Sequence, residues 1–261
     1  MGQRLTGLLV CVMAMMVPVR AADQRKLPDS VKSALEFFEG HADLSIDEFL
    51  QRMRPSPIDA IQRARVIAAL PRGAIQPDVQ TLAKMSLGEE VLAYHGRRTL
   101  ITFTIVNVAP AFIGLHGRSV ILVSANILPL LNKEEFAALA AHEIGHEYVW
   151  AEYRRAEKRH DHARIRELEL RCDGIAVLTL RRLGLDAHRL LRAVQVLTWY
   201  NRELGLDENA RDYVSRDKRT AFIGAVAELQ WADRDFNSRE GELTDEVRRV
   251  SPHSSRHRPA E

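Results

Sequence analysis

The sequence predicts an α+β fold that is mainly helical, and two observations carry this prediction. Apolar residues recur at helical spacing over residues 29–87 and again from residue 133 almost to the C-terminus. Between these regions, residues 99–108 and 118–124 are rich in β-branched side chains, which is typical of strands. The chain of 261 residues is long enough to bury a substantial core, so we expect one principal domain with a small sheet.

Residues 1–21 have the composition of a secretory signal peptide. Arg4 supplies the positive charge, residues 5–17 form an apolar stretch, and Val19 and Ala21 are acceptable residues ahead of a predicted cleavage after Ala21. The apolar stretch is short for a membrane span, which needs about 20 residues. We therefore expect an exported protein, periplasmic or secreted, with membrane association only through an uncleaved signal.

The composition excludes two classes of protein. A hydrophobic content of 46% is too high for a chain that is disordered throughout. Removing the two arginines of the signal brings the 37 basic residues to 35, equal to the 35 acidic residues, which argues against a nucleic-acid partner. The mature chain keeps Cys172 as its only cysteine, so we expect no internal disulfide.

Residues 22–90 are predicted to form a helical N-terminal region without a chemical motif. We interpret this region as an accessory part of the domain or a pro-segment. Three or four amphipathic helices are expected in it, delimited by capping residues and prolines. The first helix is expected to be capped by Asp29 or Ser30 and to end at Gly40, and the second is expected to begin at Ser45. The third is expected from Pro57 to Pro71, and a fourth from about Pro77 to Leu87.

Residues 91–235 are predicted to form the main domain. Its two strands are separated by a turn-like segment, Gly114–Gly117. Gly184 and Gly205 are expected to end two of the helices that follow. These helices are predicted at 133–157, 161–183, 186–204 and 216–232. The charged remainder, residues 236–261, is expected to be a disordered tail.

The segment His142-Glu143-Ile144-Gly145-His146 carries the clearest chemistry. Residues four apart lie one turn apart on a helix, so His142 and His146 can direct both imidazoles at one metal ion. Glu143 would lie beside that ion, where a general base can take a proton from a metal-bound water. Apolar and small neighbours predict that the helix is buried, and two buried histidines without a partner would be costly. A metal ion is the simplest partner.

A catalytic zinc normally has three protein ligands, so a third is expected downstream. Glu169 and Asp173 are four residues apart and share one helix face. Glu169 could close the zinc site, and Asp173 could accept the free N–H of a zinc-bound histidine. The metzincin pattern fails because Val149 and Glu152 stand where its glycine and third histidine would be. The rival ligands lie off this face, in charged or terminal segments, or without a partner nearby: His160, His162, Glu167, Cys172, His188, His253 and His257.

With these motifs in order, residues 112–184 resemble the zinc metallopeptidases that include HtpX and the CAAX prenyl proteases, together with their soluble periplasmic relatives. The resemblance covers under a third of the chain. Three blocks carry it: Ala111-Phe112 followed by 118–124, Glu134–Phe136 leading into the HExxH motif, and Glu169–Gly174 followed by Leu183–Asp186.

The resemblance implies a zincin-like metalloprotease domain with an HExxH active-site helix and a small edge sheet. It implies a gluzincin site, in which Glu143 is the general base and Zn²⁺ is held by His142, His146 and Glu169. It also implies that the strand near 119–124 is an edge strand that pairs with an extended polypeptide substrate. The substrate-binding residues on that strand would be Ser119, Ile121 and Val123.

Three departures from the family are visible. Pro110 stands where the family often has asparagine, and the multiple membrane spans of HtpX-type members are missing. The family's later His-Pro element has no match, and its nearest region, 215–219, lacks the histidine. The group that stabilises the oxyanion is therefore left open among Tyr213, Arg216 and Arg219.

The function predicted from the sequence is a zinc-dependent metalloendopeptidase that hydrolyses peptide bonds of exported proteins. In this interpretation Glu143 activates a zinc-bound water. The alternative is a catalytically weak, metal-stabilised chaperone or assembly factor that binds exported proteins without cutting them.

Overall fold

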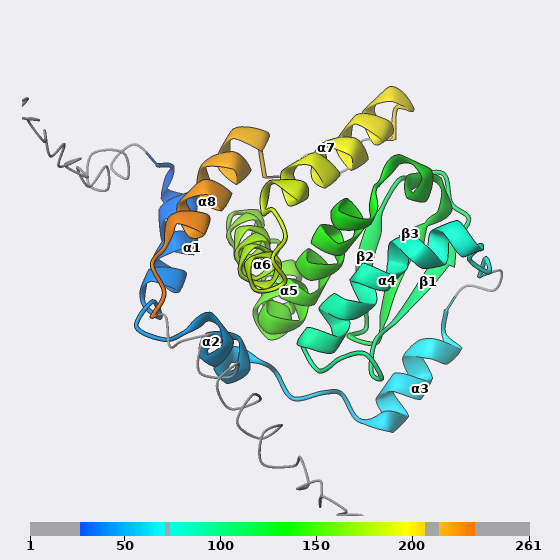
Figure 1. The fold of residues 1–261 in the computed structure, drawn as a ribbon, viewed down its shortest axis with the longest axis horizontal. Coiled ribbons are helices and arrows are strands. Elements are labelled where there is room, and N and C mark those ends of the chain that lie inside the picture. The colour runs from blue at the N-terminus through cyan, green and yellow to red at the C-terminus, as the bar shows by residue number, and fades with distance from the viewer. Residues whose placement is uncertain (1–26, 71–73, 207–213, 233–261) are drawn as a thin grey trace, which may run out of the picture.

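A computed structural model describes residues 27–70, 74–206 and 214–232 (Figure 1). Over these residues the fold is mainly helical with a small three-stranded sheet, so the predicted α+β class is confirmed. The predicted signal at 1–21 and the predicted tail at 236–261 lie outside the described residues. The elements are α1 (Asp29–Glu39), α2 (Ile46–Met53), α3 (Ala60–Ala68), α4 (Val79–Tyr94), β1 (Thr102–Val106), β2 (Ile113–His116), β3 (Val120–Ser124), the 3₁₀ helix η2 (Ala125–Leu130), α5 (Lys133–Lys158), α6 (His162–Arg182), α7 (His188–Glu203) and α8 (Arg216–Glu228).

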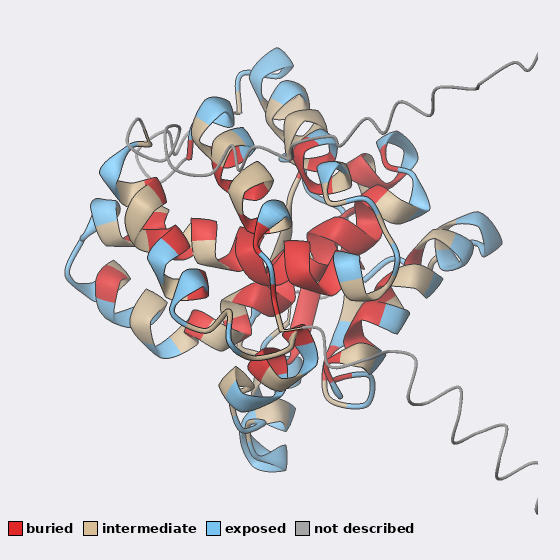
Figure 2. Ribbon diagram, turned by 60° about the vertical axis from the view of Figure 1, so that its left-hand side comes forward, coloured by how far each residue is buried: buried red, intermediate tan, exposed pale blue. Residues whose placement is uncertain are grey.

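Helices α5 and α6 form the centre of the fold and carry the metal-site motifs. Helix α5 begins with a capping box: the Asn132 side chain accepts the backbone N–H of Glu135, and the Glu135 carboxylate accepts the backbone N–H of Asn132. From Glu135 to Gly145 its residues are buried, because α4, α6, α7 and β2 pack around it. Figure 2 shows the buried residues concentrated in the middle of the fold.

Gly145 lets α5 and α6 approach closely, and we expect Gly145→Ala to destabilise the protein. A Cβ atom at this position would lie 2.7 Å from the Cα atom of Cys172 and 2.8 Å from its carbonyl oxygen, so the backbone of α6 would have to move. Overpacking of this kind typically costs about 1–3 kcal/mol of unfolding free energy. Denaturant unfolding measures the loss.

Gly224→Ala is the matched control for this substitution. Gly224 lies in α8, and nothing stands within 4 Å of the position of its added Cβ. Alanine there is expected to stabilise the protein by about 0.5–1 kcal/mol, because glycine weakens a helix interior. Equal unfolding free energies for the two variants would contradict the close α5–α6 packing.

The sheet has the strand order β1-β3-β2, which corrects the prediction of an edge strand at 119–124. Strand β3 is the central strand, because it pairs in parallel with β1 and antiparallel with β2. The predicted substrate-binding residues Ser119, Ile121 and Val123 are fully buried, and their strand has no free edge.

The strand at the edge beside the site is β2, which overlaps the segment Gly114–Gly117 that the sequence indicated as a turn. The chain turns only after His116, where Gly117 and Arg118 both have a φ of 56°. The sequence did not indicate this strand, because β2 spans only four residues and contains Gly114, a residue type that is unusual inside strands.

Four helices are present in the N-terminal region, within the predicted range. Ser45 caps α2 as expected, whereas α1 begins directly after Pro28 rather than at a side-chain cap on Asp29 or Ser30. Helix α3 is shorter than predicted and buries none of its residues. The predicted boundary at residue 90 falls inside α4, and α1 and α4 pack on α6 and α5 in one shared core.

The helices after the sheet match the predicted segments closely. Gly184 and Gly205 follow the ends of α6 and α7 with φ values of 68° and 64°, the left-handed conformation expected for them. Helix α8 ends at Glu228, four residues before the predicted limit at 232. Of the helices in the described ranges, none combines the length and apolar character that crossing a membrane requires.

Candidate metal centre

The two histidines of the HExxH motif lie one turn apart on α5 and face α6. The Nε2 atom of His142 is 3.4 Å from Oε2 of Glu169, and the Nε2 atom of His146 is 3.7 Å from Oε1 of the same carboxylate. The two imidazole rings stand at 84° to each other with their centroids 5.0 Å apart. The structure therefore brings together the two histidines and the carboxylate that the sequence analysis selected.

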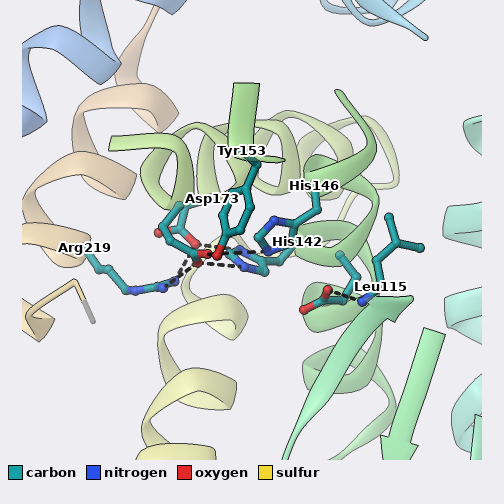
Figure 3. A network of polar contacts seen from close by, with 8 residues as sticks. Leu115, His142, His146, Tyr153, Asp173 and Arg219 are labelled. Atoms are coloured by element: carbon teal, nitrogen blue, oxygen red, sulfur yellow. Dashed lines mark hydrogen bonds and ion pairs between the residues drawn. The ribbon is translucent and has the colours of Figure 1, made fainter. Parts of the chain in front are cut away.

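Asp173 orients His142 from behind. The Nδ1 atom of His142 lies 2.8 Å from Oδ1 of Asp173, which is fully buried one turn along α6 from Glu169. This contact places the Nδ1–H of His142 on the carboxylate and directs Nε2 toward Glu169, so that Nε2 can act as a ligand once it has lost its proton. The predicted role of Asp173, to fix the imidazole of a metal-bound histidine, agrees with this geometry (Figure 3).

Glu143 lies beside the histidine pair and is held by strand β2. His142, Glu143 and His146 offer ligand atoms within 4.8 Å of one another, so they form a group that could hold a metal ion. The backbone N–H of Leu115 donates to Oε2 of Glu143 at 2.7 Å, as the right side of Figure 3 shows. The edge strand thus fixes the direction of the Glu143 carboxylate.

Two residues of the site come from further away in the chain. Arg219 of α8 is buried and donates to Oδ1 of Asp173 at 2.6 Å, and its Nη2 lies 3.4 Å from Oε2 of Glu169. The hydroxyl of Tyr153 donates to Oε1 of Glu169 at 3.1 Å, and its ring contacts the ring of His146. Each Glu169 oxygen therefore faces one imidazole and one hydrogen-bond donor.

Tyr153 was not among the predicted site residues, and Arg219 was one of three candidates for the group that stabilises the oxyanion. A signal for Tyr153 existed, since it follows His146 by seven residues and so shares its helix face. Arg216, another candidate, is exposed, and Tyr213 lies outside the described residues. Arg219 reaches the site because α8 packs on α6, and this packing cannot be deduced from the sequence around Arg219.

The rival ligands that the structure describes do not reach the site. Glu167 pairs with Arg164 and Arg171 on its own helix. His160 and His188 are exposed, His162 lies at the start of α6, and buried Cys172 packs against Gly145. His253 and His257 lie outside the described residues.

Charges in the metal-free site are tightly coupled. Burial alone would lower the pKa of His142, but the hydrogen bonds and charges of Asp173 and Glu169 outweigh it and raise that pKa to about 10. Burial would raise the pKa of Glu169, but His146, His142 and Arg219 hold it well below its usual range. Burial raises the pKa of Glu143, against the opposing effect of the two histidines and the Leu115 N–H.

The donor set fits a zinc ion. Two imidazole nitrogens and one carboxylate converge from two packed helices, and three ligands of this kind with an open fourth position are typical of catalytic zinc. The hydrogen bond from His142 to Asp173 is the outer contact that usually accompanies a zinc-bound histidine.

A cavity of about 700 Å³ lies over these side chains. One wall is the segment 111–117, which includes β2, and another wall comes from α7, including Val194 and Asn201. His142, Glu143, His146, Tyr153, Glu169 and Arg219 all line it. None of the predicted substrate-binding residues on β3 does, so a ligand of this cavity would meet β2 instead.

Zinc binding is expected to release at least one proton per ion near pH 7.5, one from His142 and a further fraction from a zinc-bound water. The pKa of His142 is about 10 before binding, so its imidazolium must lose a proton before Nε2 can act as a ligand. Zinc affinity should consequently rise about tenfold per pH unit between roughly pH 7 and 9. Titration calorimetry in buffers of different ionisation enthalpy counts the proton, and a heat that does not depend on the buffer would contradict this account.

Comparison with known proteins assigns no family to this geometry. No protein-family model matches the chain, and no curated protein matches it significantly. What the chain does must therefore be inferred from the residues of the site.

Proposed function

We propose that the chain is a zinc-dependent peptidase that hydrolyses peptide bonds of exported polypeptides. One observation carries this proposal: His142, His146 and Glu169 converge from two packed helices, and a second carboxylate, Glu143, lies beside them at the wall of a cavity. The signal-like composition of residues 1–21 supports an exported protein and hence exported substrates.

His142, His146 and Glu169 would hold the zinc ion, and Tyr153 and Arg219 would keep the Glu169 carboxylate in place. Bound zinc acts as a Lewis acid that lowers the pKa of a water toward about 7 and polarises a carbonyl group. Arg219 also offsets the negative charge that Glu169 and Asp173 bring into the buried site.

Glu143 is the general base of the proposed reaction. It takes a proton from the attacking water and later delivers it to the leaving amine. Leu115 binds Oε2, which leaves Oε1 of Glu143 available for this transfer. Burial raises the pKa of the Glu143 carboxyl, and a stronger base takes the proton from the attacking water more readily.

Strand β2 replaces the buried strand β3 as the surface on which a peptide substrate would extend. It lies at the edge of the sheet, lines the cavity, and contacts Glu143 through Leu115. A peptide added to this edge would run past the general base and gain main-chain hydrogen bonds without regard to its sequence.

Cleavage of an unstructured polypeptide by the purified chain tests this function. Activity is expected with one equivalent of zinc, is expected to disappear with a chelator, and should return when zinc is added. Binding of the same polypeptide without any cleavage, unchanged in Glu143→Gln, would instead establish the chaperone or assembly factor.

A further inference from the structure

Only part of the edge of β2 is open to a peptide. The backbone N–H of Ser124 donates to the carbonyl of Phe112, and the backbone N–H of Ser119 donates to the carbonyl of His116. The backbone groups of the even-numbered residues between 112 and 116 therefore face β3. Antiparallel pairing alternates along the strand, which turns the backbone groups of Ala111, Ile113 and Leu115 toward the cavity.

Asn201 of α7 closes this edge at Ala111. Its Oδ1 atom accepts the backbone N–H of Ala111 at 2.8 Å, and its Nδ2 donates to the backbone carbonyl of Ala111 at 2.9 Å. The amide side chain makes the same two bonds that a residue of a neighbouring strand would make. A peptide added to β2 therefore cannot pair with Ala111.

Leu115 lies at the other end of the open edge. Its N–H is bound to Glu143, which places the general base at this residue. Ile113 lies between the two occupied positions, and no hydrogen bond joins its outward groups to another described residue. Its N–H and C=O provide the one complete pairing site between Glu143 and Asn201.

The direction in which the peptide runs along β2 decides whether the block at Ala111 limits its length on the N-terminal or the C-terminal side of the cut bond. An antiparallel peptide runs from the residue opposite Leu115 to the residue opposite Ile113 in its own N-to-C direction. Two residues further along it would meet Ala111, where Asn201 already occupies the pairing position. With a rise of about 3.3 Å per residue, roughly three peptide residues fit between the general base and this block.

We propose that Asn201 is a specificity-determining residue and that the substrates are linear peptides cut within about three residues of a free C-terminus. This inference rests on the proposed peptidase function and narrows it. The sequence predicted an endopeptidase, whereas the closed edge selects a short leaving segment on the C-terminal side of the cut bond.

The test compares linear peptides with head-to-tail cyclic peptides of the same residues, incubated with the zinc-loaded chain and mapped by mass spectrometry. Cuts are expected within about three residues of the free C-terminus, and cyclic peptides, which have no C-terminus, should be cut at least about tenfold more slowly. If cyclic peptides, or internal bonds of linear peptides, were cut as fast as bonds near a free C-terminus, the proposed role of Asn201 would be overturned. The proposed peptidase function would still stand. No cutting of any peptide would overturn both.

Asn201→Ala is expected to free the backbone groups of Ala111 for pairing with a peptide. The rate of internal cuts should then rise about tenfold, which corresponds to roughly one additional hydrogen bond to the substrate. Asn126→Ala is the matched control. The Asn126 amide also bonds two backbone groups, the carbonyls of Val108 and Ala109, but it does not line the cavity. A cut pattern in Asn201→Ala that equals that of Asn126→Ala would contradict the proposal. The map of cuts in linear peptides uses only the unchanged chain, so it decides the question even if Asn201→Ala does not fold.

Discussion

Replacing Glu143 with glutamine is expected to lower peptide hydrolysis by about 100- to 10,000-fold, the usual contribution of a general base. Glutamine keeps an oxygen that can accept the Leu115 N–H, so the side chain should retain its position. Its amide cannot take a proton from the attacking water. Zinc content and unfolding free energy should therefore stay close to those of the unchanged chain while the rate falls.

Glu157→Gln is the control for this loss. Glu157 lies on the same helix and lines the same cavity, but its carboxylate pairs with Arg154 on the surface. Its replacement should leave the hydrolysis rate within about twofold, because surface ion pairs contribute little. Full activity in Glu143→Gln with zinc bound would show that another group supplies the base.

Asp173→Ala is expected to weaken both the fold and the zinc site. Asp173 is fully buried between His142 and Arg219, so its removal leaves a buried guanidinium with less compensation, which costs about 3–5 kcal/mol of unfolding free energy. His142 also loses the acceptor that orients it, and zinc affinity should fall about 10- to 100-fold. Denaturant unfolding of the metal-free protein and competition with a zinc chelator measure the two effects separately.

Asp173→Asn separates geometry from charge. The Oδ1 atom of asparagine can still accept from His142 and from Arg219, which both bond that atom in the structure. Zinc affinity should therefore lie between those of the unchanged chain and of Asp173→Ala. An Asp173→Ala protein with unaltered stability and affinity would contradict the role given to this carboxylate.

The helix faces that carry the proposed ligands could be predicted because they depend on local helix geometry. His142 and His146, like Glu169 and Asp173, are pairs four residues apart, and helical spacing alone puts each pair on one face. The helix limits were predictable for a similar reason, since Gly184 and other cap residues act within one turn of their helices.

Features that depend on contacts between distant segments could not be predicted in this way. Which strand lies at the sheet edge depends on pairing across the whole sheet, and the resemblance to known metallopeptidases pointed to β3 rather than β2. The place of Arg219 depends on how α8 packs on α6, and it meets Asp173 across 46 residues of sequence. Asn201 likewise meets Ala111 across 90 residues.

The most direct test of the account is the zinc content of the purified chain, compared with Glu169→Ala and with Glu167→Ala. Glu167 is the matched control, because it lies two residues earlier on α6 and pairs with Arg164 and Arg171 away from the site. The account predicts one zinc ion per unchanged chain, a similar content in Glu167→Ala, and weakened or lost zinc in Glu169→Ala. An unchanged chain that takes up no zinc under native conditions, or a Glu169→Ala protein that binds it as tightly, would contradict the three-ligand site.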